Sequence, residues 1–588
     1  MTRIAIVRKD KCYLKKCSFI CASACPINRL GKDCITESNT KARIDEILCN
    51  GCHICVAKCP YSAISIINLP EQLKEDPIHR FGENAFELFS LPIVKKNTVV
   101  GIIGRNGIGK STALSILAGN LQPNLGNFKN SQKKEEIIKK YSTSWIADYF
   151  TKLFANKVKI SYKPQRIELL PELYNGKVID LLKKIDERKI LDKLVKELDI
   201  ENIKDRDINN LSGGELQRVA IIAAAIKKAD FYYFDEPSSF LDITYRIKIA
   251  KIIRDIVDQE NASVVVIEHD LATLDYISDE IQIVYGEPTC YGIFSQSKSV
   301  RRGINEYLSG FLDSENIRFR NYPIKFADSN LIKSYSKDIL YEIPELGKKF
   351  DSFSLEVNPL ELHKGEVLCI MGANGLGKTT FLNLVSGNLK SDKNEIKIKN
   401  ISYKKQVLDS PDIKVIDFLK EKAGSEFSSG WYKQNILEKL NIQSILNNSL
   451  KDLSGGELQK VHIAANLSGD TELVLMDEPS AFIDVEDRLN VAEVIKEFVS
   501  KKEISAIIVD HDIQLIDHLS DSMLVFEGTP GKSGRVNSVL NKKDGMNKIL
   551  KILDITYRKD KETNRPRINK PGSQLDREQR KKGEYYYI

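Results

Sequence analysis

Two glycine-rich segments have the residue types and the spacing of a phosphate-binding loop. They read GRNGIGKS at residues 104–111 and GANGLGKT at residues 372–379. Glycines in such a loop let backbone N–H groups close around phosphate oxygens, and the lysine of each loop, Lys110 or Lys378, reaches the terminal phosphates. Apolar residues precede each loop and a helical pattern follows it, so each loop is predicted to join a buried strand to a helix N-terminus, which attracts anions. The sequence therefore predicts two sites for a nucleoside triphosphate.

The residues expected to bind phosphate in the two loops form matching sets. They are Gly104, Asn106, Gly107, Gly109, Lys110, Ser111 and Thr112 in the first loop, and Gly372, Asn374, Gly375, Gly377, Lys378, Thr379 and Thr380 in the second. Ser111 and Thr379 are also expected to coordinate Mg²⁺ through their hydroxyl oxygens.

Each half also contains an apolar segment that ends in two adjacent acids. The segments are FYYFDEP at 231–237 and LVLMDEP at 473–479, and both have the pattern of a buried strand. We expect Asp235 and Asp477 to hold Mg²⁺ through water. Glu236 and Glu478, one residue further on, are placed to polarise the attacking water.

The motifs recur at equal spacing, which indicates an internal duplication. In each half, the serine of LSGGELQ precedes the glutamate of DEP by 24 residues, and that glutamate precedes a histidine by 33 residues. These histidines, His269 and His511, follow the next apolar strand and are expected to bond the γ-phosphate and sense its loss. A lone histidine is more often structural, but its recurrence at the same spacing favours a functional role.

One interval differs between the halves. Lys110 and Gln165 are 55 residues apart, whereas Lys378 and Gln406 are 28 residues apart. The extra residues are assigned to the segment 131–157, whose apolar and aromatic residues have helical spacing, so a helical hairpin is predicted there. Its lysines and aromatic residues together suit a polyanion surface, although packing against the first copy is the alternative.

Taken together, these motifs resemble those of an ATP-binding cassette (ABC) ATPase, for which LSGGE is highly specific. The resemblance makes Gln165 and Gln406, which end SYKPQ and SYKKQ, the glutamines that act beside Mg²⁺ at the catalytic centre. It further implies that each ATP lies between the phosphate loop of one copy and the LSGG segment of the other. One site would pair Lys110 with Ser454, Gly455 and Gly456, and the other would pair Lys378 with Ser212, Gly213 and Gly214.

Members of this family stack the adenine on an aromatic residue upstream of the phosphate loop. Phe81 and Phe86 are the candidates in the first copy, and Phe353 is the candidate in the second. Each of these residues could equally belong to the core.

Nine of the eleven cysteines lie before residue 60, which favours metal ligands over disulfides. Two runs of four, each closed by a proline, resemble a two-cluster ferredoxin, in which the last cysteine of each run ligates the other cluster. The resemblance assigns one [4Fe–4S] cluster to Cys12, Cys17, Cys21 and Cys59, and the other to Cys49, Cys52, Cys55 and Cys25. Two zinc sites are the competing interpretation. Cys34, Cys290 and Cys369 are left over and are expected to be buried.

We therefore expect a multidomain α/β protein, with a ferredoxin-like two-cluster domain followed by two tandem P-loop ABC-type nucleotide-binding domains. The predicted boundaries are residues 1–70 for the iron–sulfur domain, 71–295 for the first cassette, 296–325 for a first hinge, 326–555 for the second cassette, and 556–588 for a basic second hinge.

This arrangement closely resembles the ribosome-recycling ABC proteins, also called the RNase L inhibitor family or ABC subfamily E. The resemblance covers nearly the whole chain, including VRRGINEYLSGFLDSENIRFR at 300–320 as the first hinge and NRPRINKPGSQLDREQRKKGEYYYI at 564–588 as the second. It implies a monomeric ATPase whose closure moves the iron–sulfur domain and splits ribosomes beside a release or rescue factor. The protein would then stay on the small subunit until hydrolysis, with rRNA contacts from the hairpin and hinges.

Bulk properties agree with a cytoplasmic location. No apolar run approaches the ~18 residues that span a bilayer, and the N-terminus lacks the apolar region of a signal peptide. The net charge is +7.

Three other functions compete with ribosome recycling, namely those of an ATPase subunit of a transporter, an ATP-gated iron–sulfur electron-transfer protein, and a DNA-repair ATPase. The first gives the clustered cysteines no role, the second lacks a visible electron acceptor, and the third needs a long coiled coil within a cassette.

Overall fold

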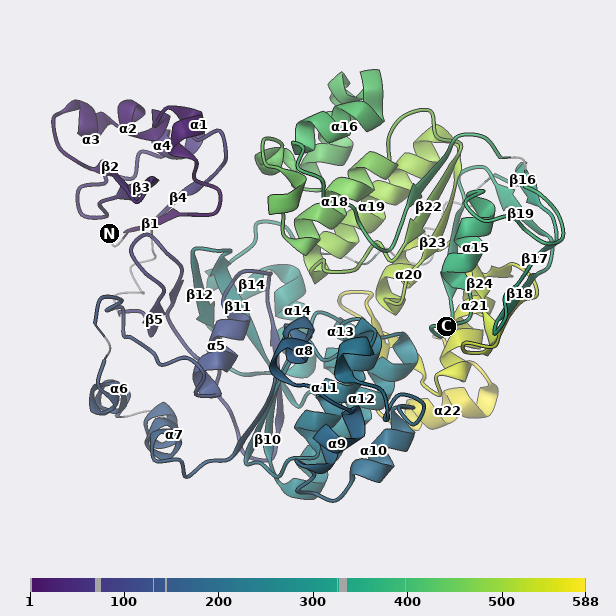
Figure 1. Ribbon diagram of the computed structural model, residues 1–588, viewed down its shortest axis with the longest axis horizontal. Helices are drawn as coiled ribbons and strands as arrows, with labels where there is room; N and C mark the ends of the chain where they lie inside the picture. Colours follow the sequence, from purple (N-terminus) through teal and green to yellow (C-terminus); the bar gives the residue numbers. More distant parts are fainter. Residues whose placement is uncertain are drawn as a thin grey trace. The chain divides into compact units, whose positions relative to one another are not determined.

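The computed structural model describes residues 3–68, 76–130, 132–142, 145–324, 326, 336–396 and 398–586. The chain divides into two compact units. The first comprises Met1–Phe240, Lys248–His269 and Ile277–Pro323, and the second comprises Leu241–Ile247, Asp270–Tyr276 and Ile324–Ile588. Figure 1 shows the elements of both units along the chain.

The N-terminal part of the first unit, drawn in purple in Figure 1, is a small domain of short elements around buried cysteines. Strand β1 (Arg3–Val7) pairs antiparallel with β4 (Ile64–Asn68), and β2 (Ile35–Ser38) forms a hairpin with β3 (Lys41–Ile44). Four short helices carry or flank the cysteines, and they are α1 (Leu14–Cys17), α2 (Ile20–Ala24), α3 (Pro26–Arg29) and α4 (Ile54–Lys58). A core this small benefits from cross-linking by bound metal.

One buried asparagine fastens this domain to the loop that follows it. Asn84 donates through Nδ2 to the carbonyl oxygens of Ala5 and Ile44, at 2.8 and 2.9 Å, and its Oδ1 accepts from the Ile44 N–H at 2.8 Å. Arg80 adds a bidentate pair with Glu46 at 2.9 and 3.0 Å. The loop between β5 (His79–Arg80) and β6 (Glu87–Leu88) is therefore part of both the small domain and the cassette.

The first cassette is built on a sheet whose strand order is β5-β6-β12-β11-β7-β10-β9-β8. Strands β11 (Glu280–Glu287), β7 (Val99–Ile103), β10 (Ser263–Ile267), β9 (Phe231–Asp235) and β8 (Ile160–Lys163) run parallel. Every residue of β7 and β10 is buried, as expected for parallel strands covered on both faces. Strand β12 (Tyr291–Phe294) pairs antiparallel with β11 and parallel with β6, and β13 (Lys298–Ser299) pairs antiparallel with β11.

Helices surround this sheet and continue into the predicted first hinge. They are α5 (Lys110–Leu117), α6 (Lys134–Lys140), α7 (Trp145–Phe154), α8 (Leu170–Leu173), α9 (Val178–Lys183), α10 (Leu191–Glu197), α11 (Gly213–Ala225), α12 (Ile243–Glu260), α13 (Leu271–Ile277) and α14 (Val300–Ser309). Strands β14 (Phe311–Leu312) and β15 (Ile317–Arg318) form a short hairpin after α14.

The segment 131–157 contains helices α6 and α7, and its residues 131, 143 and 144 lie outside the described residues. The aromatic residues of α7 pack inward, because Tyr149 and Phe150 are buried in the core of the cassette. The hydroxyl groups of Tyr149 and Tyr233 lie 2.7 Å apart. Attributing these aromatic residues to a polyanion surface was therefore wrong, and the exposed lysines of α6 are what the hairpin presents to solvent.

The second cassette repeats the parallel core in the order β21-β22-β23-β20-β24, and β27 adds an antiparallel strand at the edge beside β24. The strands are β21 (Ile401–Lys404), β22 (Leu473–Asp477), β23 (Ser505–Val509), β20 (Val367–Met371), β24 (Ser522–Val525) and β27 (Leu540–Asn541). A separate mixed sheet contains β17 (Leu346–Lys349), β18 (Ser354–Val357), β26 (Ser533–Val536) and β25 (Glu527–Thr529), in which β18 and β26 are parallel and the outer pairs are antiparallel. Strand β16 (Ile339–Ile343) pairs antiparallel with β19 (Leu360–His363). The position of each phosphate loop after a buried strand, β7 or β20, is thus the same in both copies.

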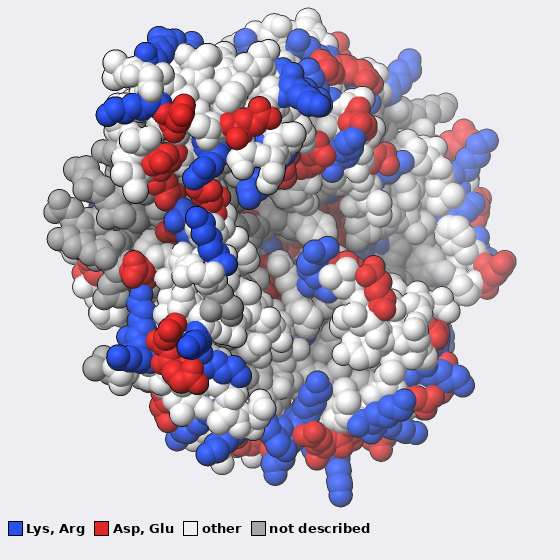
Figure 2. All heavy atoms as spheres, turned by 60° about the vertical axis from the view of Figure 1, so that its left-hand side comes forward, with Lys and Arg blue, Asp and Glu red and all other residues white. Residues whose placement is uncertain are grey.

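The helices of the second unit follow the same order as those of the first cassette. They are α15 (Lys378–Val385), α16 (Val415–Ala423), α17 (Gly430–Tyr432), α18 (Gly455–Asn466), α19 (Val485–Lys502), α20 (Ile513–Leu519) and α21 (Lys542–Ile552). The basic C-terminal segment is ordered, with a hairpin of β28 (Tyr557–Lys559) and β29 (Pro566–Ile568) followed by α22 (Gln574–Lys582). On the face drawn in Figure 2, basic and acidic side chains are interspersed, so no field of a single sign covers that face.

Candidate nucleotide and metal sites

Each phosphate loop holds its lysine against its own backbone. The ammonium of Lys110 donates to the carbonyl oxygens of Gly104 and Arg105, both at 2.8 Å. Lys378 makes the same two bonds to Gly372 and Ala373, both at 2.8 Å. Burial lowers the pKa of Lys378 to about 8, and nearby carboxylates oppose that shift. The two loops therefore share one preformed geometry, with helix α5 or α15 beginning at the lysine.

An aromatic ring lies against the last glycine of each loop. Gly109 has a φ of +94°, and a Cβ there would lie 2.6 Å from the Cζ of Phe86. Gly377 has a φ of +87°, and a Cβ there would lie 2.8 Å from the Cζ of Phe353. Glycine is required on both counts. Phe86 and Phe353 are thus equivalent residues, and each ring packs against the last glycine of its phosphate loop.

A second aromatic residue in each copy is exposed. The side chain of Phe81 is 54% exposed and that of Phe350 is 43% exposed, and each ring centroid lies 6.4 Å from that of Phe86 or Phe353, respectively. An exposed ring beside the phosphate loop is what adenine stacking needs. Sequence reasoning missed Phe350 because the exposed and the partly buried ring are five residues apart in the first copy and three in the second.

The oxygen atoms expected to hold Mg²⁺ come together in both copies. In the first, the hydroxyl of Ser111 donates to Oε1 of Gln165 at 3.5 Å. Both carboxylate oxygens of Asp235 are buried and have no hydrogen-bond partner within the described part of the chain. Burial and the adjacent Glu236 raise the pKa of Asp235 to about 6. Hydroxyl, amide and carboxylate oxygens are the ligands that Mg²⁺ prefers, so this set fits that ion.

The second copy differs in one bond. The hydroxyl of Thr379 donates directly to Oδ2 of Asp477 at 2.7 Å, whereas Ser111 points to its glutamine. Burial raises the pKa of Asp477 as well. The donor set is otherwise the same, because Gln406 replaces Gln165 at the end of the equivalent strand.

In each copy, the glutamate that is predicted to polarise water accepts a hydrogen bond from a glutamine and lies close to a histidine. Gln165 Nε2 donates to Glu236 Oε1 at 2.7 Å, and Nε2 of His269 lies 3.4 Å from the same oxygen. Burial would raise the pKa of Glu236, but the interaction with His269 and the charge of Lys110 outweigh it and lower that pKa to about 2. Glu236 is therefore ionised, as a group that polarises water must be.

The second glutamate has the same geometry and a different electrostatic setting. Gln406 Nε2 donates to Glu478 Oε1 at 2.8 Å, and Nε2 of His511 lies 3.6 Å from that oxygen. Burial, followed by the charges of Asp477 and Asp510, raises the pKa of Glu478. Burial also lowers the pKa of His511 well below its usual value. The two centres therefore share one geometry, whereas their surroundings shift the pKa of the glutamate in opposite directions.

The LSGG serines begin helices α11 and α18 through capping boxes. The hydroxyl of Ser212 donates to Oε2 of Glu215 at 2.8 Å, and the Glu215 N–H donates back to that hydroxyl at 3.4 Å. Ser454 and Glu457 repeat both bonds at the same distances. The glycines that follow, Gly213, Gly214, Gly455 and Gly456, lie in the first turns of these helices. Because each LSGG segment and its predicted partner loop belong to different units, their pairing stays a prediction.

The eight predicted cluster ligands form two groups of neighbours. Burial and, after it, the neighbouring Cys59, Cys17 and Cys12 raise the pKa of the Cys21 thiol to about 12. Burial raises the pKa of Cys55 to about 11, and the contributing neighbours there are Cys49, Cys52 and Cys25. Cys59 thus lies with the first run and Cys25 with the second, which is the exchange expected of a two-cluster ferredoxin.

The remaining cysteines are buried. Cys34 lies beside Cys25 and Cys49, and burial raises the pKa of its thiol to about 12. Cys290 contacts the small domain through Ile4 and Ile6, and Cys369 lies within β20. Within the described residues, no group of three or more His, Cys, Asp or Glu side chains could hold a single metal ion as the side chains stand.

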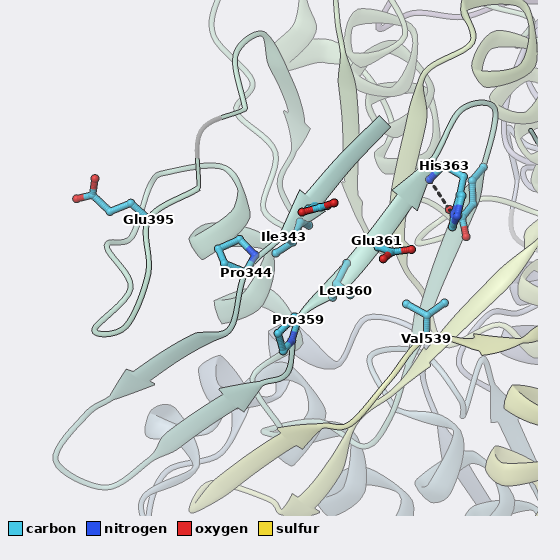
Figure 3. Close-up of a pocket in the computed structure, with 10 residues that line it drawn as sticks. Ile343, Pro344, Pro359, Leu360, Glu361, His363, Glu395 and Val539 are labelled. Atoms are coloured by element: carbon cyan, nitrogen blue, oxygen red, sulfur yellow. Dashed lines mark hydrogen bonds and ion pairs between the residues drawn. The ribbon is translucent and has the colours of Figure 1, made fainter. Parts of the chain in front are cut away.

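A hollow that the sequence did not predict lies along strands β16 and β19 and has a volume of about 580 Å³. Residues that include Pro344, Glu361 and His363 line it (Figure 3). None of its lining residues is a predicted site residue. Across the part of the chain that the structure describes, no helix is both long enough and apolar enough to cross a membrane.

Comparison with family models identifies both kinds of domain. The ABC transporter model matches residues 92–239 and 355–481, and the 4Fe-4S binding domain model matches residues 42–65. The fold and the two sites thus define a twin-cassette ATPase of the ABC class with an N-terminal iron–sulfur domain, and the chain is an ATP hydrolase.

Full-length relatives show to which family within this class the chain belongs. An uncharacterized ABC transporter ATP-binding protein of Methanocaldococcus jannaschii is 48% identical over all of this chain and 98% of its own length. The ABC transporter E family member 1 of Arabidopsis thaliana is 40% identical over all of this chain and 99% of its own. The chain belongs to the E family of ABC proteins, the RNase L inhibitor family.

Solved structures show the same likeness. The structure of ribosome-bound archaeal Pelota and ABCE1 contains a chain with a TM-score of 0.93 and 47% identity, covering all of this chain and 99% of the other. A complex of the archaeal ribosomal stalk protein aP1 with the archaeal ribosome recycling factor aABCE1 gives a TM-score of 0.84 and 47% identity, covering 88% of this chain and all of the other.

Proposed function

We propose that this chain recycles ribosomes. Binding of two ATP molecules closes the cassettes, closure moves the iron–sulfur domain, and that movement separates the large from the small ribosomal subunit after termination or rescue. The chain then stays on the small subunit until hydrolysis reopens the cassettes, as in a two-state clamp.

The observation that supports this proposal best is the likeness, over 88% of this chain, to a protein described as an archaeal ribosome recycling factor. Both catalytic centres also keep a complete set of lysine, hydroxyl, glutamine, acids and histidine. A protein that had become a passive binding module would not need two intact hydrolytic centres.

The details of the machinery are proposals on the same footing. We assign two [4Fe–4S] clusters, one to Cys12, Cys17, Cys21 and Cys59 and the other to Cys25, Cys49, Cys52 and Cys55. We retain the predicted domain boundaries and the pairing of each phosphate loop with the LSGG segment of the other copy. Adenine stacking is assigned to Phe81 and Phe350, since both rings are exposed.

The partners follow from the same function. The chain acts as a monomer on the ribosome, beside a release or rescue factor, and therefore works in the cytoplasm. Exposed lysines of α6, such as Lys134 and Lys139, are suited to rRNA phosphates, and such contacts weaken as salt rises. Substituting these lysines is expected to weaken ribosome binding more than basal ATP hydrolysis.

The deciding experiment is co-sedimentation of anaerobically prepared protein with ribosomes and with isolated small subunits. The nucleotide is omitted, or supplied as ADP or as a non-hydrolysable ATP analogue, and the double variant Glu236→Gln/Glu478→Gln is run beside the unmodified chain. Retention on small subunits with the analogue or in the variant, but not with ADP, supports recycling. If the protein never migrates with ribosomes, recycling fails and ATP-gated electron transfer becomes the function to test.

The cluster count has its own test. Anaerobically purified protein should contain eight iron atoms per chain if two [4Fe–4S] clusters are present. Cys52→Ser should lower the iron content, whereas Cys34→Ser should leave it at eight. Bound zinc in place of iron would replace this assignment with the competing one.

A further inference from the structure

A buried lysine lies directly beneath the catalytic glutamate in each cassette. Lys163 ends β8 and Lys404 ends β21, two residues before the catalytic glutamines, and their side chains belong to residues only 1% and 3% exposed. The Lys163 ammonium donates to the carbonyl oxygens of Asp235 and Glu236, at 2.8 and 3.1 Å. Lysine is almost never fully buried without partners, so such a placement needs a reason.

The second cassette repeats this contact independently. Lys404 donates to the carbonyl oxygen of Asp477 at 2.7 Å and to that of Glu478 at 3.3 Å. A lysine that merely filled space would not be expected to find the same two carbonyl groups in both copies. The catalytic acids themselves do not bind the ammonium through hydrogen bonds, because their backbone carbonyl groups are its acceptors.

The peptide that the lysine grips has an unusual conformation. Glu236 and Glu478 both have a φ of +47°, in the left-handed region that costs free energy for any residue with a Cβ. This conformation turns each glutamate out of its strand and toward Gln165 or Gln406. A strained peptide persists only when surrounding groups hold it in place.

A glutamine from the LSGGELQ helix donates a further hydrogen bond to the same peptide. Gln217 Nε2 donates to the carbonyl oxygen of Glu236 at 2.9 Å, and Gln459 Nε2 donates to that of Glu478 at 2.6 Å. The glutamate N–H is also bonded, to the carbonyl oxygen of Ile267 at 3.0 Å or of Val509 at 2.8 Å. The peptide is therefore fixed from both sides, with the lysine supplying the charged donor.

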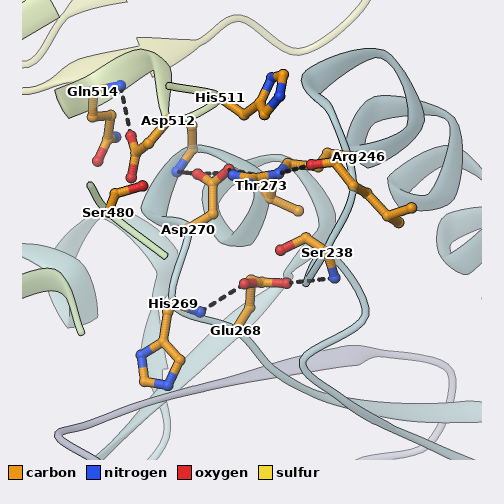
Figure 4. Close-up of polar contacts among 12 residues, drawn as sticks. Ser238, Arg246, Glu268, His269, Asp270, Thr273, Ser480, His511, Asp512 and Gln514 are labelled. Atoms are coloured by element: carbon orange, nitrogen blue, oxygen red, sulfur yellow. Dashed lines mark hydrogen bonds and ion pairs between the residues drawn. The ribbon is translucent and has the colours of Figure 1, made fainter. Parts of the chain in front are cut away.

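A carboxylate on the next strand balances the buried charge. Glu268 lies close enough to interact electrostatically with Lys163, and Asp510 does so with Lys404. Glu268 accepts from the N–H groups of His269, at 2.7 Å, and of Ser238, at 3.3 Å (Figure 4). The lysine, the glutamate and the segment that carries the histidine thus belong to, or directly follow, three neighbouring strands, β8, β9 and β10 in the first cassette.

We propose that Lys163 and Lys404 are positioning residues for ATP hydrolysis, each pinning the strained peptide that aims the catalytic glutamate at the attacking water. The hydrogen bonds of both lysines go to the peptides that carry the glutamates, so their removal should impair the chemical step and spare nucleotide binding. This inference rests on the ATPase activity and not on the ribosomal function.

The test compares Lys163→Met and Lys404→Met, singly and together, with Lys159→Met and Lys405→Met as matched controls. Lys159 and Lys405 are exposed lysines near the same two strands. ATPase kinetics are measured on the full chain without ribosomes. Because hydrogen bonds from charged donors are strong, the double variant Lys163→Met/Lys404→Met should lose roughly 10- to 100-fold in kcat. Its KM should stay within about twofold, as expected when only a transition-state interaction is lost.

Two further measurements separate positioning from folding. Combining the double lysine variant with Glu236→Gln/Glu478→Gln should produce little additional loss, since residues that act as a unit are not additive. The pair Lys163→Gln/Lys404→Gln keeps a shorter neutral donor and should recover part of the rate. An unchanged kcat in the methionine variants overturns the proposal. Equal losses in nucleotide binding and kcat, or full additivity with the glutamate variants, also overturn it.

Discussion

Gln165 donates a hydrogen bond of 2.7 Å from its side-chain amide to the carboxylate of Glu236, and the opposite end of the same amide accepts from Ser111 at 3.5 Å. One side chain therefore connects a predicted Mg²⁺ ligand with the group that polarises water. A shift of the metal ion would therefore be transmitted through the Gln165 amide to the Glu236 carboxylate without any movement of the backbone.

The double variant Glu236→Gln/Glu478→Gln tests the role of these carboxylates. We expect kcat to fall by at least ~100-fold, within the range that general bases contribute, because an amide cannot accept the proton. ATP binding should persist because the phosphate loops are unchanged. Single-turnover hydrolysis measured beside equilibrium nucleotide binding checks both statements. Hydrolysis at the rate of the unmodified chain would remove these residues from the mechanism.

Substitutions of two aromatic residues near the second phosphate loop should have different effects, one on ATP binding and the other on thermal stability. Phe350→Ala removes an exposed ring, so we expect weaker ATP binding by the second cassette and little change in thermal stability. Phe353→Ala removes the ring behind Gly377 and should lower the unfolding temperature. Nucleotide titration and thermal unfolding are measured on both variants. The reverse pattern would return adenine stacking to Phe353.

Sequence reasoning identified the parallel strands, the phosphate loops and the acids, because local pattern and spacing encode them. It did not identify Phe350, since which of two nearby rings faces solvent depends on packing against Gly377. It assigned no role to Lys163 and Lys404, whose side chains donate to the peptides that carry Glu236 and Glu478, because motif spacing does not show which side chains are buried. The aromatic residues of α7 were misread for the same reason, because an amphipathic pattern does not say what covers its apolar face.

Nucleotide binding by the second cassette should take up protons above pH 8. Burial lowers the pKa of Lys378 from its ordinary value to about 8 in the nucleotide-free chain, so the ammonium is partly deprotonated at pH 8.5. A bound polyphosphate favours the charged form and raises that pKa, so a proton enters on binding. At pH 7 the lysine is already charged and no uptake is expected from it.

Isothermal titration in buffers of different ionisation enthalpy measures this uptake. The heat of binding should depend on the buffer at pH 8.5 more strongly than at pH 7. Lys378→Ala should abolish the part of the uptake that belongs to the second cassette. Uptake that persists undiminished in that variant would contradict the assignment.

Asn84 should control the attachment of the iron–sulfur domain. Asn84→Ala leaves three buried backbone groups of Ala5 and Ile44 without their partner, at ~1–3 kcal/mol for each unpaired group. We expect faster hydrogen exchange in β1 and β3, measured by mass spectrometry, with unchanged exchange in β20 to β24 of the other unit. Glu83→Gln changes an exposed ion pair in the same loop and serves as the control. Equal protection in Asn84→Ala and the control would show that other contacts hold the domain.

The capping boxes of α11 and α18 affect how mutations at the LSGG serines can be understood. A hydroxyl has one hydrogen, and in each copy that hydrogen is already given to a glutamate three residues on. If the serine is to serve a phosphate, it must exchange one acceptor for another, so the net gain in binding is smaller than a new bond would supply. Replacing Ser212 or Ser454 by alanine therefore removes a helix cap as well as a nucleotide contact. Replacing Glu215 or Glu457 by glutamine, which leaves the serine in place, is the substitution that tells these two losses apart.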